Sequence, residues 1–241
     1  MTQTLLYKGD HINRANVVWN IAGSFVYAFA SMVLSFLVIR LAGEEQGGIF
    51  SFGFSTLGQQ LFLVAYFGIR PFHITDGAGE YTFGDYREHR NITCLIALAA
   101  GAVFMMIRHG AYLRGVGDYN GEKCTILLLL VVYKVIDGYA DVYESEFQRQ
   151  GSLYLTGKSN FFRTILSVSV FTVILAAFEN LLLACLAAVA AQIGGVILFN
   201  MDVIHALSDV KWEAKKGQCR KLFLSTGFLF VSVFLDFYIF S

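Results

Sequence analysis

Four charged residues share one face of a helix within an apolar stretch of this sequence: Lys134, Asp137, Asp141 and Glu144. At about 100° per residue, their spacing places all four within about 80° of one another. An ionised side chain facing lipid at mid-bilayer costs about 2.5 to 3.5 kcal/mol on insertion scales, so this face should line a hydrated cavity or contact another helix. An ion pair between Lys134 and Asp137 that holds two helices together is the simplest alternative, but it leaves two carboxylates over. The stripe therefore favours a polar interior that binds a ligand or an ion.

The composition is that of a membrane protein. Of the 241 residues, 56% are hydrophobic and only 15% are charged, which is far more apolar than a soluble globular domain. Apolar runs near the roughly 20 residues that cross the hydrocarbon core predict seven spans, at 17–41, 48–74, 91–107, 122–143, 160–177, 181–200 and 222–240. We therefore expect an all-α polytopic membrane protein, with a six-helix transmembrane bundle and one further transmembrane helix.

The basic residues predict the orientation. With the N-terminus in the cytoplasm, twelve Lys and Arg residues fall in cytoplasmic segments and four in outer segments, which agrees with the positive-inside rule. The twelve are Lys8, Arg14, Arg87, Arg90, Arg149, Lys158, Arg163, Lys211, Lys215, Lys216, Arg220 and Lys221. The four are Arg40, Arg108, Arg114 and Lys123.

These predictions divide the chain into four parts. Residues 1–16 form a cytoplasmic N-terminal segment, 17–200 a lobe of six transmembrane helices, 201–221 a basic cytoplasmic linker, and 222–241 a seventh transmembrane helix. No internal repeat is visible across the first six spans. Because the seventh helix has no sibling helices, we expect it to begin a second lobe that lies beyond residue 241 or is supplied by another chain.

Motifs for catalysis, cofactors or metals are lacking. Gly157-Lys158-Ser159 ends like a phosphate-binding loop, but the glycine required five positions earlier is replaced by Ser152. The four cysteines have no CxxC spacing, and His73 has no partner at metal-ligand spacing. No nucleophile is paired with a base. We therefore expect no enzyme activity, no cofactor, no metal and no nucleic acid partner.

Other polar residues extend the predicted hydrated interior. Gln59 and Gln60 lie in the middle of the second span. Arg40 and Arg70 lie near the outer and inner mouths, although snorkelling of the side chain explains Arg40 equally well. Pro71 should restrict Arg70 to an extended or turn conformation and end or kink the helix there, which favours a function for Arg70.

Two groups of residues resemble a known family. The first two spans are similar to the first two helices of bacterial polysaccharide-unit flippases, through Arg40-Leu41-Ala42-Gly43 leading to Gly48-Ile49-Phe50, and Phe67-Gly68-Ile69-Arg70 leading to Thr75-Asp76. The fourth and fifth helices of that family are matched by Tyr133-Lys134, Asp137, Asp141-Val142-Tyr143-Glu144, Gln148, and Gly157-Lys158-Ser159 with Arg163. The resemblance runs from about Asn20 to Asn200. These Wzx-like exporters of O-antigen and capsule units belong to the multidrug/oligosaccharidyl-lipid/polysaccharide (MOP) superfamily.

The resemblance implies a carrier of two six-helix lobes in the bacterial cytoplasmic (inner) membrane. Its substrate would be an undecaprenyl-pyrophosphate-linked oligosaccharide, moved to the outer leaflet for the synthesis of lipopolysaccharide or capsule. Since a pyrophosphate needs cationic donors, the expected substrate-binding residues are Arg40, Gln59, Gln60, Arg70 and Lys134. Asp137, Asp141 and Glu144 would carry a coupling ion or cavity charge. Such carriers have at least twelve helices, so the expected partners are membrane lipid and a second lobe or second copy.

Three alternatives remain at the level of the sequence. A cation-coupled multidrug exporter of the same superfamily would use an acidic cavity, whereas arginines at both mouths favour an anionic substrate. The chain could instead be an inactive half-carrier or a non-transporting membrane partner. A membrane-embedded glycan polymerase or transferase would need a larger outer loop than residues 108–123.

Overall fold

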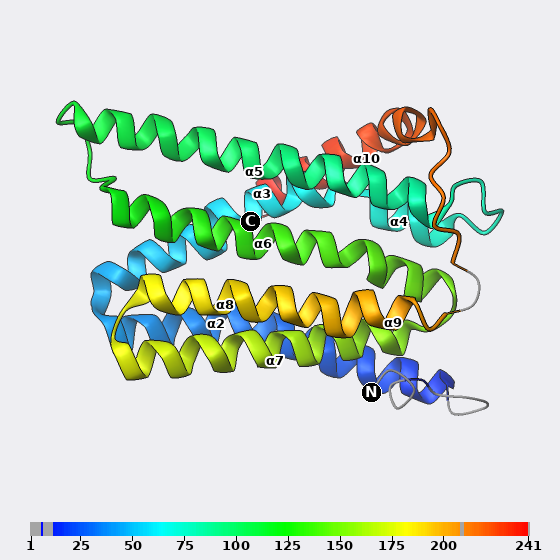
Figure 1. Ribbon diagram of the computed structural model, residues 1–241, viewed down its shortest axis with the longest axis horizontal. Coiled ribbons are helices and arrows are strands. Elements are labelled where there is room, and N and C mark those ends of the chain that lie inside the picture. Colours follow the sequence, from blue (N-terminus) through cyan, green and yellow to red (C-terminus); the bar gives the residue numbers. More distant parts are fainter. Residues whose placement is uncertain (1–5, 7–11, 208–209, 241) are drawn as a thin grey trace.

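The computed structural model describes residue 6, residues 12–207 and residues 210–240, so most of the predicted segment 1–16 lies outside the described residues. The described chain is 85% helical and contains no strand. Its long helices run side by side along the longest axis of the molecule (Figure 1). They are α2 (Ile12–Ser51), α3 (Gly58–Tyr66), α4 (Ile69–Thr75), α5 (Phe83–Leu113), α6 (Gly121–Arg149), α7 (Leu153–Phe178), α8 (Leu181–Val196) and α10 (Gln218–Phe240). Shorter pieces complete the chain: η2 (Phe52–Leu57), η3 (Ile197–Met201) and α9 (Asp202–Ile204).

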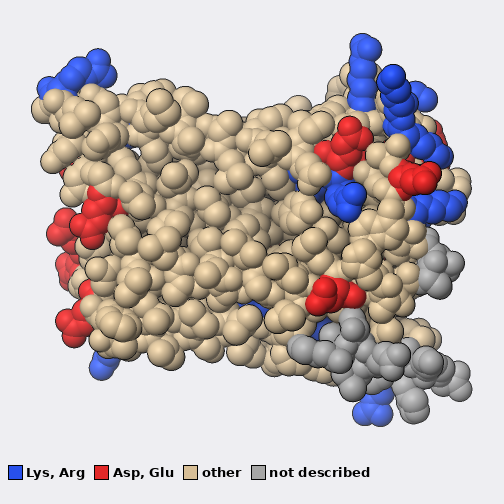
Figure 2. All heavy atoms as spheres, in the orientation of Figure 1, with Lys and Arg blue, Asp and Glu red and all other residues tan. Residues whose placement is uncertain are grey.

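Five helical stretches in the described part of the chain are long and apolar enough to cross a membrane. They are Ile12–Thr75, Phe83–Leu113, Leu153–Phe178, Leu181–Ile204 and Gln218–Asp236. Figure 2 shows charged side chains gathered at the two ends of the molecule, with little charge between them on the face shown. The prediction of an all-α, multi-pass membrane protein is therefore confirmed. The count of seven spans stays a prediction, because the charged helix α6 is not among the five stretches. The orientation of the N-terminus also stays a prediction.

The first stretch reverses direction at Gly43. This residue has φ 88° and ψ 172°, a backbone conformation that is strained for any residue with a Cβ. Before it, α2 runs toward one end of the molecule, and α3 and α4 return along the opposite direction (Figure 1). The reversal brings α3 and α4 beside α6.

A second break lies between α3 and α4, and it corrects one expectation. Phe67 and Gly68 both adopt left-handed conformations, with φ of 53° and 64°. Pro71 lies within the first turn of α4, where a missing N–H removes no intrahelical hydrogen bond. The predicted break at Pro71 is therefore wrong, and Arg70 is helical.

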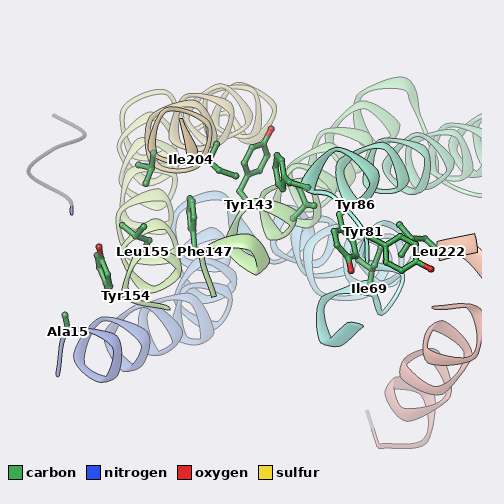
Figure 3. Packing of buried hydrophobic residues seen from close by; sticks show 13 residues of the cluster. Ala15, Ile69, Tyr81, Tyr86, Tyr143, Phe147, Tyr154, Leu155, Ile204 and Leu222 are labelled. Atoms are coloured by element: carbon green, nitrogen blue, oxygen red, sulfur yellow. The ribbon is translucent and has the colours of Figure 1, made fainter. Parts of the chain in front are cut away.

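The helix α6 lies at the centre of the packing and contacts α2, α3, α4, α5, α7 and α8. At the end of the molecule where α9 lies, a cluster of buried apolar side chains joins α2, α4, α5, α6, α7, α9 and α10 (Figure 3). Its members include Ile69, Tyr86, Phe147, Leu155, Ile204 and Leu222. On the other side of the bundle, α10 packs against α5, α3 and α4. These contacts fix α6 relative to every helix that supplies a residue to the site described next.

Candidate functional site

The four charged residues of the α6 stripe all lie inside the bundle. Lys134, Asp137, Asp141 and Glu144 are each at most 6% exposed. A carboxylate held away from water at this depth is stable only when donors surround it. Arginines from three other helices provide these donors.

Asp137 joins four helices. Its Oδ1 accepts hydrogen bonds from Arg163 Nη2 of α7 at 2.7 Å and from Gln192 Nε2 of α8 at 3.0 Å. Its Oδ2 accepts one from the hydroxyl of Tyr27 of α2 at 2.7 Å. With three donors around it, this carboxylate is well compensated as an anion.

Asp141 binds two guanidinium groups at once. Its Oδ1 accepts from Arg70 Nη1 of α4, and its Oδ2 accepts from Arg90 Nη2 of α5 at 2.8 Å. Arg70 also donates to Gln148 Oε1 at 3.1 Å, and Arg90 to the Ala65 carbonyl at 2.8 Å. The two arginines therefore tie α3, α4 and α5 to α6.

Glu144 shares its cations with the two aspartates. Its Oε1 lies 3.3 Å from Arg163 Nη2, and its Oε2 lies 3.7 Å from Arg70 Nη1. The hydroxyl of Ser159 lies 3.2 Å from Oε1. Glu144 therefore lies between the Asp137 and Asp141 groups and connects them.

Lys134 differs from the other cations because no hydrogen bond or ion pair to it is found among the described residues. Its Nζ lies 4.0 Å from the centroid of the Phe54 ring and 5.8 Å from that of Tyr27. The alternative of a Lys134–Asp137 ion pair is not realised, since Asp137 is bound by Arg163. We call the seven side chains of this group the charge cluster: Arg70, Arg90, Lys134, Asp137, Asp141, Glu144 and Arg163. It contains four cationic groups and three carboxylates, and Lys134 is the cation in excess.

Two cavities open onto the charge cluster. The first, which we call the Lys134 cavity, has a volume of about 220 Å³. It is lined by Tyr27, Ala28, Ala30, Ser31, Leu34, Phe54, Ser55, Gln59, Tyr133, Lys134, Asp137 and Thr164. The second, of about 120 Å³, is lined by Tyr27, Phe62, Arg70, Asp137, Asp141, Glu144, Asn160 and Arg163. Tyr27 and Asp137 line both, so the cavities are neighbours.

The predicted site residues divide between these cavities and the surface. Gln59 lies with Lys134 and Asp137 in the Lys134 cavity. The second cavity brings together Arg70 and the three carboxylates. Arg40 is exposed and Gln60 is half-buried, and neither lines either cavity. The geometry therefore separates these two residues from the rest of the predicted set.

Two arginines of the charge cluster, Arg90 and Arg163, were placed in cytoplasmic segments by the sequence and were not among the predicted site residues. Arg90 and Arg163 are 0% and 2% exposed and bind the two aspartates of α6. The sequence does indicate a polar helix face that includes Arg163. The residues of this face recur at helical spacing: Asn160, Arg163, Thr164 and Ser167. Arg90 follows a polar run and carries no comparable signal.

Comparison with family models, with characterised proteins and with solved structures finds no match for this chain. No group of three or more His, Cys, Asp or Glu side chains that could hold a metal ion occurs in the described part of the chain. The chemistry of the site follows from its own groups. The Lys134 cavity offers an ammonium with three donors, an amide and hydroxyl groups, whereas its carboxylate is already bound.

Proposed function

We propose that this protein is a membrane transporter, a flippase for an amphipathic anion of the class of undecaprenyl-pyrophosphate-linked oligosaccharides. The observation that carries the proposal is Lys134, a buried ammonium beside a cavity, for which the described residues provide no ion-pair partner. A buried charge without a counter-charge is unfavourable, and an anionic oxygen in the cavity would supply the missing hydrogen bonds. Phosphate oxygens bind lysine in this way.

The other groups of the cavity suit a phosphate that carries sugars. Gln59, Ser31 and Ser55 bring amide and hydroxyl groups to the lining, and these exchange hydrogen bonds with sugar hydroxyls. A volume of about 220 Å³ is small for a whole oligosaccharide. Transport therefore requires the cavity to widen, for which we propose rocking against a second lobe or a second copy in the bacterial cytoplasmic membrane.

The charge cluster also distinguishes between an anion and a cation as substrate. A multidrug exporter for organic cations needs a carboxylate that the substrate can approach. Asp137 has three donors and Asp141 has two guanidinium groups. Glu144 lies 3.3 Å from Arg163 and 3.7 Å from Arg70, so each of the three carboxylates already has a cationic partner within the bundle. Lys134 is the charge left for a ligand, which favours an anion.

Complementation of a flippase-deficient bacterium by the 241-residue chain tests the proposal. We expect the wild-type chain and Lys134→Arg to restore polymerised surface glycan, and Lys134→Met to restore none at equal membrane insertion. Lys123→Met is the matched control, because Lys123 lies in the first turn of the same helix and pairs with Asp118 outside the cavity. Full glycan with Lys134→Met, or an inserted wild-type chain without glycan, would contradict the proposed transport.

A further inference from the structure

A third hollow, which we call the groove, adjoins the Lys134 cavity on the face of the bundle where α2 and α7 meet. This groove has a volume of about 250 Å³. It is lined by Phe25, Val26, Phe29, Ala30, Val33, Thr164, Ile165, Val168 and Ser169. Ala30 and Thr164 line both the groove and the Lys134 cavity. The polar cavity and the apolar groove are therefore neighbours.

The packing of α2 on α7 explains why the groove is present. The two helices approach closely at Gly23 and Gly157, where a Cβ on Gly23 would lie 2.3 Å from the Gly157 carbonyl oxygen. Beyond this contact, larger residues follow on α2. The rings of Phe25 and Phe29 contact each other at a tilt of 32°, with centroids 4.3 Å apart, and the two residues are 60% and 45% exposed. Their rings form a wall of the groove that faces away from the bundle.

We propose that the groove binds the hydrocarbon chain of the anion whose phosphate is held at Lys134. This inference rests on the proposed function, because it assumes that an anion occupies the Lys134 cavity. The chain of an amphipathic phosphate must remain in an apolar environment while its head is buried among polar groups. Ala30 lines both the Lys134 cavity and the groove, and no member of the charge cluster lines the groove. The lining of the groove is apolar except for Thr164 and Ser169, so it suits hydrocarbon and not a sugar.

Two soluble probes distinguish binding of the phosphate head from binding of the hydrocarbon chain: inorganic pyrophosphate and farnesyl pyrophosphate. Their affinities are measured on the purified full chain in lipid nanodiscs. We expect Val33→Phe to weaken farnesyl pyrophosphate by about tenfold, since the larger ring occupies space in the groove that the hydrocarbon chain needs. Inorganic pyrophosphate should bind Val33→Phe as it binds the wild type, because Val33 does not line the Lys134 cavity. Met32→Phe is the matched control, because Met32 is 61% exposed on the same helix and lines neither hollow.

The outcomes distinguish this inference from the proposed function. Lys134→Met should weaken both probes, and a wild-type chain that binds neither probe would overturn the anion site and the groove together. Unchanged binding of farnesyl pyrophosphate to a folded Val33→Phe protein would overturn the groove alone. A farnesyl pyrophosphate analogue with a photoactivatable diazirine in its chain tests the wild type without substitution. Labelling within residues 25–33 or 164–169 supports the groove, and labelling confined to other helices overturns it.

Discussion

Arg163 binds Asp137 with 2.7 Å between Nη2 and Oδ1, although Lys134 lies only three residues before Asp137 on the same helix. The same guanidinium nitrogen lies 3.3 Å from Glu144, so Arg163 connects two carboxylates of α6 to α7. The lysine is directed to the Phe54 ring instead. The arginine therefore joins α6 to α7, whereas no carboxylate within ion-pair distance of the lysine is found in the described part of the chain.

The first prediction concerns this division of roles. Arg163→Met leaves Asp137 with only Tyr27 and Gln192 and removes the closest cation of Glu144. Removing one partner of a buried ion pair costs about 3 to 5 kcal/mol, and thermal unfolding of the detergent-purified protein should show the loss. Adding Asp137→Asn should recover part of it, since the orphaned charge is removed. A variant Arg163→Met as stable as the wild type would show that the pair does not support the fold.

The sequence predicts the features that depend on a pattern within one segment. The helical, membrane-spanning character follows from apolar runs, because every backbone polar group in lipid must be satisfied within a helix. The inward direction of the α6 stripe follows from periodicity, and the structure shows these side chains inside the bundle. Both depend on patterns within one segment.

The partners of the stripe could not be predicted in the same way. Asp141 binds Arg70 and Arg90, which lie 71 and 51 residues away along the chain. Such pairs depend on which helices are neighbours, and the sequence alone places Lys134 nearest to Asp137. Likewise, Pro71 is the stronger local signal for a break, but the break occurs at Phe67 and Gly68, where α10 packs on the chain.

The second prediction concerns the close approach of α2 and α7. Gly23→Ala would place a methyl group 2.3 Å from the Gly157 carbonyl oxygen, so the helices must separate. Overpacking of this kind costs about 1 to 3 kcal/mol, seen as a lower unfolding temperature. Gly48→Ala is the matched control, because a Cβ there meets nothing within 4 Å. It should stabilise the helix by about 0.5 to 1 kcal/mol. Equal effects of the two substitutions would show that the glycine contact is unimportant.

The third prediction concerns pH and the connection between α4 and α5. Partial burial raises the pKa of Asp76, but the backbone N–H groups of Tyr81 and Glu80 and the Tyr86 hydroxyl outweigh it and hold the pKa below its ordinary value. A lowered pKa in the folded state stabilises the fold above the unfolded pKa of about 3.9, and this stabilisation is lost as the pH falls through the folded pKa. Asp76→Asn should therefore unfold at a lower temperature than the wild type at neutral pH. The difference between the two melting temperatures should close on acidification, and a difference independent of pH would contradict the role of the carboxylate.

The last prediction concerns α10, which packs on the break between α3 and α4. The ring of Phe67 stacks on Phe230 with 4.5 Å between centroids, and a Cβ on Gly68 would lie 3.1 Å from the backbone of Leu229. Gly68→Ala should therefore displace α10 and increase hydrogen–deuterium exchange of residues 218–230. Gly79→Ala is the matched control. The φ of Gly79 is 65°, close to the 64° of Gly68, but a Cβ added at Gly79 would meet nothing within 4 Å.

Both alanine substitutions carry the cost of a left-handed conformation, about 1 to 2 kcal/mol, so both should lower the unfolding temperature. Only Gly68→Ala should loosen α10, because only its methyl group meets that helix. Equal exchange of residues 218–230 in the two variants would show that backbone strain alone accounts for the effect. Faster exchange in Gly68→Ala alone would show that α10 is held by its contact with the break, two residues before the arginine that binds Asp141.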